Sequence, residues 1–314
     1  MVETHAPENS VGGYSVLLTG GSGLIGRYLS SALLSEGYKV SHLSRNAGIS
    51  GKVRIFKWNP EEKIIDTEAL KGVDYIIHLA GANIGEKRWT KKRKEEIVNS
   101  RVTSARFLHE IIDENKVNIK AFITSSATGY YGSVTSDKIF SEEDMSNDDF
   151  LGTTCRLWEE GADLFARAGV RTVKIRSAVV LEKSDSALSR LMTPARLGLV
   201  VRLGTGQQYL PWIHISDLCN IYIKAIQDEY MHGAYNAVAP EHINHNDFVR
   251  IMAGVMHRPV FLPLVPGWVL KAVLGEMSDI VLKGSRISCE KIIKAGYTFR
   301  FNNLVGALTN IIRG

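Results

Sequence analysis

The sequence predicts a doubly wound α/β domain, in which helices cover both faces of a parallel sheet, followed by a smaller mixed α/β lobe. Up to about residue 180, short apolar runs typical of doubly covered strands alternate with amphipathic helical stretches. A glycine-rich turn joins the first of these strands to the first helix. Beyond residue 180, shorter strand-like and helical pieces follow without internal repeats.

Length and composition set the domain organisation. The chain has 314 residues, of which 45% are apolar, enough for one large core and a smaller lobe. We expect a flexible tail at residues 1–13, the α/β domain at 14–180 and the lobe at 181–314. Residues 213–237 are expected to return to the first domain. The three cysteines form no disulfide pattern, and no run approaches the ~20 apolar residues of a membrane span, so we expect a cytoplasmic protein without a membrane partner.

The net charge and the spacing of potential metal ligands argue against nucleic-acid binding and against a metal site. The net charge of +5 is modest, and the basic run at residues 87–94 is flanked by glutamates. Such a run is typical of a solvated helix start, and the alternative is a rim that attracts a phosphorylated substrate. We therefore expect no nucleic-acid partner. The histidines and cysteines show no metal-ligand spacing, so no metal is expected.

The glycine-rich turn predicts a dinucleotide site. Three glycines spaced three residues apart follow the apolar run at 16–18, the first two in a turn and the third inside the first helix. The first two let the chain turn tightly and bring bare amides to an anion, and the third lets the helix pack closely. The alternative is a purely structural turn. The residues assigned to the phosphate-binding turn are Gly20, Gly23, Leu24, Ile25 and Gly26.

The end of the second strand, expected at residues 38–43, predicts which dinucleotide binds. A carboxylate about 20 residues after the glycines usually selects NAD, but no Asp or Glu occurs between Lys39 and Gly51. Arg45 stands where a guanidinium can hold a 2′-phosphate, and Ser44 can add a hydroxyl. The sequence therefore favours NADP, against the alternative that Arg45 is an ordinary exposed loop residue.

Further predicted strands end at the edge of the sheet where the cofactor is expected. Strands are expected at 53–57, 74–79, 120–126 and 170–175, with helices at 90–114 and 153–168 between them. Ligands of such sheets bind outside the carboxyl ends of the strands. The fourth strand ends in small residues that allow a ligand close approach, so Leu79, Ala80 and Gly81 join the cofactor site. The fifth ends in Ser125 and Ser126.

In these features the chain resembles the extended short-chain dehydrogenases/reductases. More narrowly, it resembles their atypical nucleotide-sugar-epimerase-like subgroup, which has its own C-terminal extension. The resemblance implies a Rossmann domain that binds NAD(P), with Ser100 among the cofactor-binding residues. It also implies a small-molecule substrate, with a nucleotide sugar as the candidate, and leaves a homodimer open. The residues that carry it are 19–26, 78–81, 99–101, 125–126, 131–132, 155–159, 212–217, 258–266 and 296–297.

The resemblance fails at the catalytic pair. The superfamily uses a Ser or Thr after the fifth strand and a Tyr followed four residues later by a Lys, whose ammonium lowers the pKa of the phenol. None of the eleven tyrosines here has a lysine four positions on, and Thr154 and Trp158 occupy roughly those places. The remaining catalytic candidates are Ser125, Ser126, Tyr130 and Tyr131.

Three functions are compatible with these residues. The first is an NADP-dependent oxidoreductase or epimerase acting on a nucleotide-sugar-like or small carbonyl substrate, in which Tyr130 or Tyr131 handles the proton. The second is a catalytically weak NADP(H)-sensing regulator that acts through a partner, and the third uses the cofactor only structurally. Weaker site candidates are Trp89, Trp158, Arg176, His214 and Asp217. Of these, Arg176 is expected to pair with a carboxylate, and Ser216 or Asp217 to cap a helix at 218–227.

Overall fold

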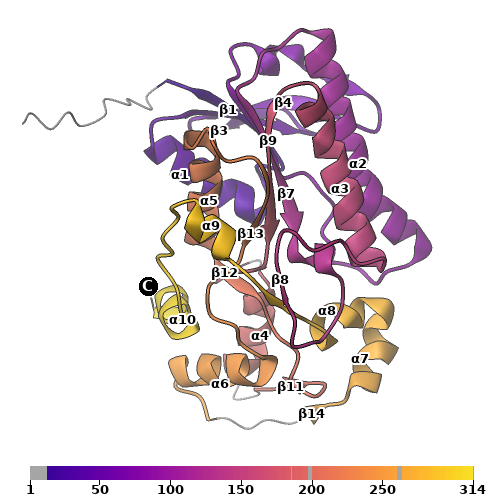
Figure 1. Ribbon diagram of the computed structural model, residues 1–314, viewed down its shortest axis with the longest axis vertical. Helices are drawn as coiled ribbons and strands as arrows, with labels where there is room; N and C mark the ends of the chain where they lie inside the picture. Colours follow the sequence, from indigo (N-terminus) through magenta and orange to yellow (C-terminus); the bar gives the residue numbers. More distant parts are fainter. Residues whose placement is uncertain (1–12, 185, 197–199, 260–263, 314) are drawn as a thin grey trace, which may run out of the picture.

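The computed structural model describes residues 13–184, 186–196, 200–259 and 264–313, so residues 1–12 of the expected tail lie outside the described residues. A central sheet runs through the molecule in the order β13-β9-β7-β6-β1-β2-β4-β3 (Figure 1). All neighbours are parallel except β3, which is antiparallel to β4, and β5 adds an antiparallel pair with β4. These strands are Ser15–Thr19 (β1), Lys39–Ser44 (β2), Gly48–Ser50 (β3), Val53–Asn59 (β4), Ile64–Ile65 (β5), Tyr75–His78 (β6), Ala121–Ala127 (β7), Arg171–Ser177 (β9) and Gly233–Ala237 (β13).

The chain reverses its direction across the sheet next to β1. It runs outward from β1 through β2 to β4, then returns to the other side of β1 and continues through β6, β7 and β9 to β13. Ligands of open α/β sheets bind in the crevice at such a switch point, outside the carboxyl ends of the strands. The loops that follow β1 and β6 lie at this switch point.

Helices cover both faces of the sheet. Val16 and Leu18 of β1 contribute to the core shared with α1 and α5, whereas Leu17 contributes to the core shared with α2 and α3. On the second face, Phe122 stacks on Phe165 with ring centroids 3.7 Å apart. The predicted doubly wound fold is therefore confirmed. The main helices are Leu24–Ser35 (α1), Lys91–Glu114 (α2), Phe150–Arg167 (α3) and Ile215–Gln227 (α5), with 3-10 turns at Thr67–Leu70 (η1) and Thr128–Tyr131 (η2).

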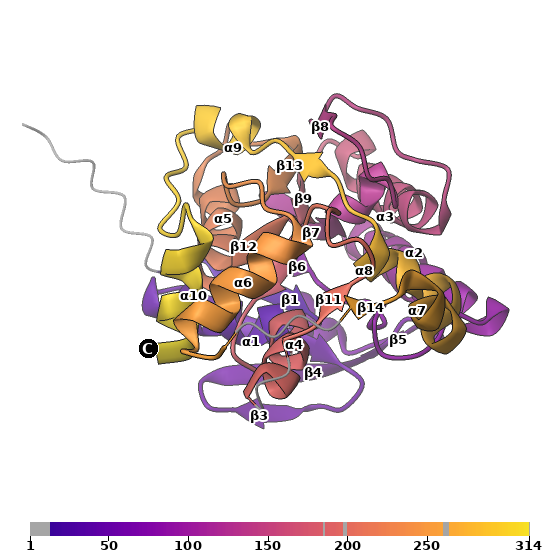
Figure 2. The ribbon, with the colours of Figure 1, turned by 90° about the horizontal axis from the view of Figure 1, so that it is seen from below.

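The smaller lobe begins two residues after β9 ends and lies below the sheet in Figure 1, on the side of the strands' carboxyl ends. Figure 2, seen from that side, shows α4 and α6 in front of the sheet. The lobe has its own core, built around Trp212, Phe248 and Leu308. Its elements, with β8 from the loop before α3, are Ile139–Phe140 (β8), Val179–Leu181 (β10), Ala187–Arg196 (α4), Arg202–Leu203 (β11), Trp212–His214 (β12), His245–Val255 (α6), Leu264–Val265 (β14), Gly267–Leu274 (α7), Gly275–Ser278 (η3), Asp279–Leu282 (α8), Arg286–Ile287 (β15), Glu290–Lys294 (α9) and Leu304–Arg313 (α10).

The start of α5 differs from the sequence prediction. The N-cap is His214, whose Nδ1 accepts a hydrogen bond from the Ser216 amide, so the expected cap at Ser216 or Asp217 was wrong. Asp217 is instead fully buried, and its carboxylate accepts hydrogen bonds from the backbone amides of Arg300 and Phe301 and from the Tyr297 hydroxyl. It therefore ties the C-terminal segment to α5.

Candidate functional site

The turn between β1 and α1 requires glycine at positions where backbone meets backbone. Gly20 has φ +68°, and a Cβ there would lie 2.9 Å from the carbonyl carbon of Leu79. A Cβ on Gly26 would lie 2.5 Å from the carbonyl oxygen of Gly20, so this residue packs the helix against the turn. Contacts this short force the backbone to move. The glycines therefore set the shape of the loop at the switch point.

The same turn leaves donors free at the start of α1. The N-cap is Gly23, which offers no side chain to cap the helix. The amides of Leu24, Ile25 and Gly26 occupy the first helical turn, where backbone N–H groups have no partner within the helix. Free amides and the positive end of the helix dipole favour an anion at this place. The residues present thus fit a dinucleotide diphosphate.

A buried chain of hydrogen bonds fixes the loop after β6 to the glycine turn. Thr19 Oγ1 accepts the amides of Leu79 and Ala80 at 3.1 and 3.0 Å, and lies 2.8 Å from His78 Nδ1. With its lone pairs engaged, the hydroxyl donates to Nδ1, so His78 carries its proton on Nε2, 3.1 Å from Ser104 Oγ. Burial lowers the pKa of His78 to about 4, and the ring is neutral at pH 7.

The loop that follows β6 is also held from α2. Ser100 Oγ accepts the Ala82 amide at 2.9 Å and donates to the Ile97 carbonyl. The structure therefore places Ser100 as a support of this loop. Gly81 faces the guanidinium of Arg101, because a Cβ built there would lie 2.9 Å from Cζ.

Arg45 lies directly beyond the end of β2 and is exposed, with Ser44 half-buried beside it. Within the described chain, Arg45 makes no ion pair or hydrogen bond, so its guanidinium is free to meet a ligand. Inside the same strand, the His42 ring occupies the space beside Gly21, where a Cβ would lie only 2.4 Å from the ring. The His42 ring thus fills the space between β2 and the glycine turn.

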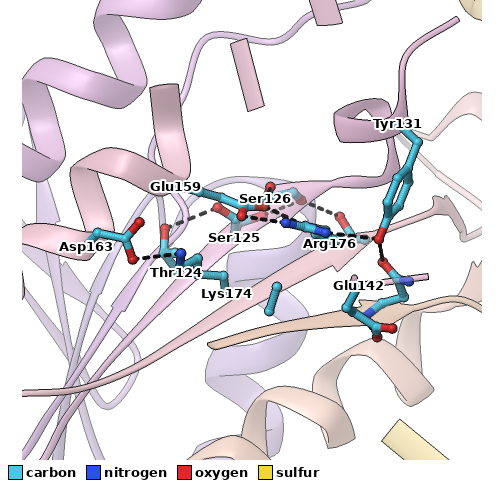
Figure 3. A network of polar contacts seen from close by, with 12 residues as sticks. Thr124, Ser125, Ser126, Tyr131, Glu142, Glu159, Asp163, Lys174 and Arg176 are labelled. Atoms are coloured by element: carbon cyan, nitrogen blue, oxygen red, sulfur yellow. Dashed lines mark hydrogen bonds and ion pairs between the residues drawn. The ribbon is translucent and has the colours of Figure 1, made fainter. Parts of the chain in front are cut away.

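Ser126 belongs to a buried ion-pair network (Figure 3). Its hydroxyl donates to Glu159 Oε1 at 2.7 Å. Arg176 stands directly opposite Ser126 in the neighbouring strand and donates to both oxygens of Glu159, at 2.7 and 2.8 Å. All three residues are at most 5% exposed. The expectation that Arg176 pairs with a carboxylate agrees with this geometry.

The network continues to Tyr131 but leaves Tyr130 at its margin. The Tyr131 hydroxyl accepts from Arg176 Nη1 at 3.0 Å and donates to Asn236 Oδ1 at 2.8 Å. Burial raises the pKa of Tyr131 to about 12. Tyr130 is half-buried, and its ring lies against the Arg176 guanidinium, with Cζ 3.4 Å from the ring centroid. Among the described residues, the Tyr130 hydroxyl has no hydrogen-bond partner.

Sequence reasoning missed Thr19, His78 and Glu159 as site-shaping residues. A signal was present for Glu159, because it follows Trp158 on the apolar side of an amphipathic helix, where an unpaired carboxylate is costly. Ser125 lies on the opposite face of β7 from Ser126, beside Tyr222. Burial raises the pKa of the Tyr222 phenol, and the Ser125 hydroxyl offsets part of that rise.

The described residues contain no group of three or more His, Cys, Asp or Glu side chains that could hold a metal ion. In the same part of the chain, no helix is long and apolar enough to cross a membrane.

Comparison with known proteins places this site in a family. Residues 16–158 match the NAD dependent epimerase/dehydratase family, and residues 265–311 match a domain of unknown function, DUF1731. The epimerase family protein YfhF of Bacillus subtilis is 35% identical over 95% of this chain and 98% of its own.

Two solved structures resemble the whole described fold. The human epimerase family protein SDR39U1, crystallised with NADPH, has a TM-score of 0.83 and 29% identity over 95% of this chain and 99% of its own. The nucleoside-diphosphate sugar epimerase of Corynebacterium glutamicum has a TM-score of 0.77 and 30% identity over 95% of this chain and 58% of its own. With its glycine turn and C-terminal DUF1731 segment, the chain belongs to the epimerase family.

Proposed function

We propose that the protein binds NADP(H) along the carboxyl edge of its sheet and uses it to oxidise or reduce a small substrate. The observation that carries the proposal is the glycine turn, whose free amides and backbone packing fit a diphosphate. The human relative crystallised with NADPH supports the choice of cofactor. The substrate that we propose is nucleotide-sugar-like, in keeping with the name of the Corynebacterium relative.

Each part of the cofactor would meet a different segment of the chain. The amides of Leu24 and Ile25 would hold the diphosphate, and Ala80 and Gly81 would lie against its backbone-facing side. Arg45 would hold the 2′-phosphate through charge-assisted hydrogen bonds, with the Ser44 hydroxyl beside it. When bound, the nicotinamide would supply or accept a hydride.

Tyr130 is our candidate for the proton. The hydroxyl of Ser126 donates its proton to a hydrogen bond with Glu159, and that of Tyr131 donates to Asn236. Tyr131 is also buried in the core. The Tyr130 hydroxyl is free within the described chain, and stacking on Arg176 fixes its ring. In the direction of reduction, Tyr130 would give its proton to the carbonyl oxygen of the substrate and recover one from water.

The observation that favours a second function is the composition of α3. This helix carries no tyrosine and no lysine, so the usual proton-transfer pair is missing. A regulator that responds to the bound form of the cofactor and acts on a partner protein would need the residues that bind NADP(H) but no proton donor. The two functions differ in turnover.

The test is NADPH oxidation against a panel of sugar nucleotides and simple carbonyls. We expect turnover with at least one substrate and a loss of about 100-fold or more in kcat for Tyr130→Phe, the size typical of a lost acid–base group. Tyr230→Phe, at a tyrosine that is 91% exposed, is the matched control and keeps wild-type turnover. Wild-type turnover in Tyr130→Phe would show that Tyr130 is not the proton donor. Saturable NADPH binding with neither oxidation of the cofactor nor epimerisation of any sugar nucleotide favours the sensor.

A further inference from the structure

Two arginines of α2 have contrasting surroundings. Arg93 is 5% exposed, and its guanidinium pairs with Glu86 at 3.2 Å and Glu96 at 2.8 Å. Arg101, eight residues later, is half-buried and makes no ion pair within the described chain. A charge that is partly removed from water without a partner is costly, so such an arrangement is retained where a ligand supplies the missing charge.

Arg101 is held rigidly although it has no carboxylate partner. Its Nη1 donates to the Ile97 carbonyl at 2.9 Å, and its guanidinium lies over the Trp158 ring, with Cζ 4.8 Å from the centroid. Gly81 leaves room for the guanidinium on the other side. The Nε and Nη2 atoms have no hydrogen-bond partner among the described residues, yet they are not sealed from solvent. Donors therefore remain available in a fixed orientation.

Among the described residues, the groups that act on Arg101 carry no compensating negative charge. The acidic group that acts on Arg101 is Cys155, and burial raises the pKa of its thiol to about 12, so it is neutral. Glu159, one turn further along α3, has both oxygens engaged by Arg176. Burial lowers the pKa of Arg101 to about 10, which leaves the guanidinium charged at pH 7.

We infer that Arg101 binds an oxyanion group, a phosphate or a carboxylate, of a ligand lying between the loop after β6 and the helix α3. This deepens the proposed function, because it names the charge that a ligand carries next to Gly81 and Trp158. A planar guanidinium with two free nitrogens suits bidentate contact with either group. The oxyanion belongs to the substrate or to the cofactor diphosphate, and the two sources are separable by experiment.

The variants are chosen to separate charge from packing. Arg101→Met keeps an unbranched side chain against Trp158 and removes the charge, and Arg101→Lys keeps the charge without the planar fork. Arg93→Met is the matched control on the same helix. Because Arg101 leaves no carboxylate unpaired, Arg101→Met is expected to unfold at no lower temperature than wild type, whereas Arg93→Met unfolds at a lower one.

Calorimetric titrations use NADPH first, and then pyrophosphate or malonate added to the NADPH-saturated protein. With a substrate-borne oxyanion, Arg101→Met binds NADPH like wild type and loses at least about tenfold in affinity for the added anions. With a cofactor-borne oxyanion, the affinity for NADPH itself falls at least about tenfold. Arg101→Lys shows a smaller loss in the same titration, and it carries the test if Arg101→Met does not fold. Arg93→Met binds like wild type.

The inference is overturned if Arg101→Met binds NADPH and both anions within twofold of wild type. It is also overturned if the wild-type NADPH complex binds neither anion while Arg101→Met leaves NADPH affinity unchanged. If wild type does not bind NADPH, the proposed function is contradicted instead. The anions are then titrated into the protein alone, where loss of binding in Arg101→Met still supports the role of Arg101.

Discussion

Replacing Glu159 by Gln tests the buried network most severely. The carboxylate accepts two hydrogen bonds from Arg176 and one from Ser126, all between 2.7 and 2.8 Å. The amide keeps the shape of the side chain but removes the charge and turns one acceptor into a donor that faces the guanidinium. Arg176 is then left as a buried charge without a counter-ion. Removing one partner of such a pair costs about 3–5 kcal/mol.

This cost is large compared with the about 5–15 kcal/mol that separates a typical folded domain from its unfolded chain. Urea unfolding measured on wild type and Glu159→Gln gives the difference directly. The matched control is Glu160→Gln on the same helix, because Glu160 pairs with Arg156 while both side chains are 44–50% exposed. That pair is worth about 0.2–1 kcal/mol. A loss below about 1 kcal/mol in Glu159→Gln, or equal losses in the two variants, refutes the assignment of Glu159 to a buried structural ion pair.

Three further predictions concern the cofactor edge. Thr19→Val removes a hydroxyl that serves two amides and an imidazole, so we expect a loss of more than about 2 kcal/mol in urea unfolding and weaker NADPH binding; unchanged stability contradicts the hydrogen-bond chain. Gly26→Ala places a Cβ 2.5 Å from a backbone oxygen and should abolish NADPH binding, whereas Gly48→Ala, which points into open space, should leave it unchanged in the same titration. Because the pKa of His78 falls from 6.5 to about 4 on folding, the unfolded chain binds its proton more tightly, and the free energy of unfolding should fall by about 3 kcal/mol between pH 6.5 and pH 4. A His78→Gln variant that keeps the wild-type pH slope in urea unfolding would exclude this residue as the cause.

The local parts of the site were predictable from sequence. The strand, the glycine spacing and the start of α1 lie within one short segment, and local backbone chemistry decides their structure. The placement of Ser44, Arg45, Leu79 and Ala80 at the carboxyl ends of β2 and β6 followed from the predicted strands, and their contact with the cofactor stays a prediction. The homodimer and the cytoplasmic compartment stay predictions.

The partners of the catalytic candidates could not be predicted, because they depend on contacts between distant segments. Ser126 meets Glu159 from a helix that follows β7 and Arg176 from the next strand, and Tyr131 meets Asn236 across 105 residues of sequence. No local pattern carries that information. The prediction of the α5 cap failed for a different reason. Ser and Asp are strong N-cap residues, but His214 is the N-cap here and accepts a hydrogen bond through its ring nitrogen.

The most direct test of the account is the dissociation constant of NADPH and of NADH for wild type, Arg45→Ala and Lys52→Ala. Charge-assisted hydrogen bonds to the 2′-phosphate predict that wild type binds NADPH at least about tenfold more tightly than NADH. Arg45→Ala loses this preference. Lys52→Ala, which removes the same charge from an exposed turn at the amino end of β4, keeps it. Equal affinity of wild type for the two dinucleotides would contradict the central claim that this edge of the sheet is built for NADP(H).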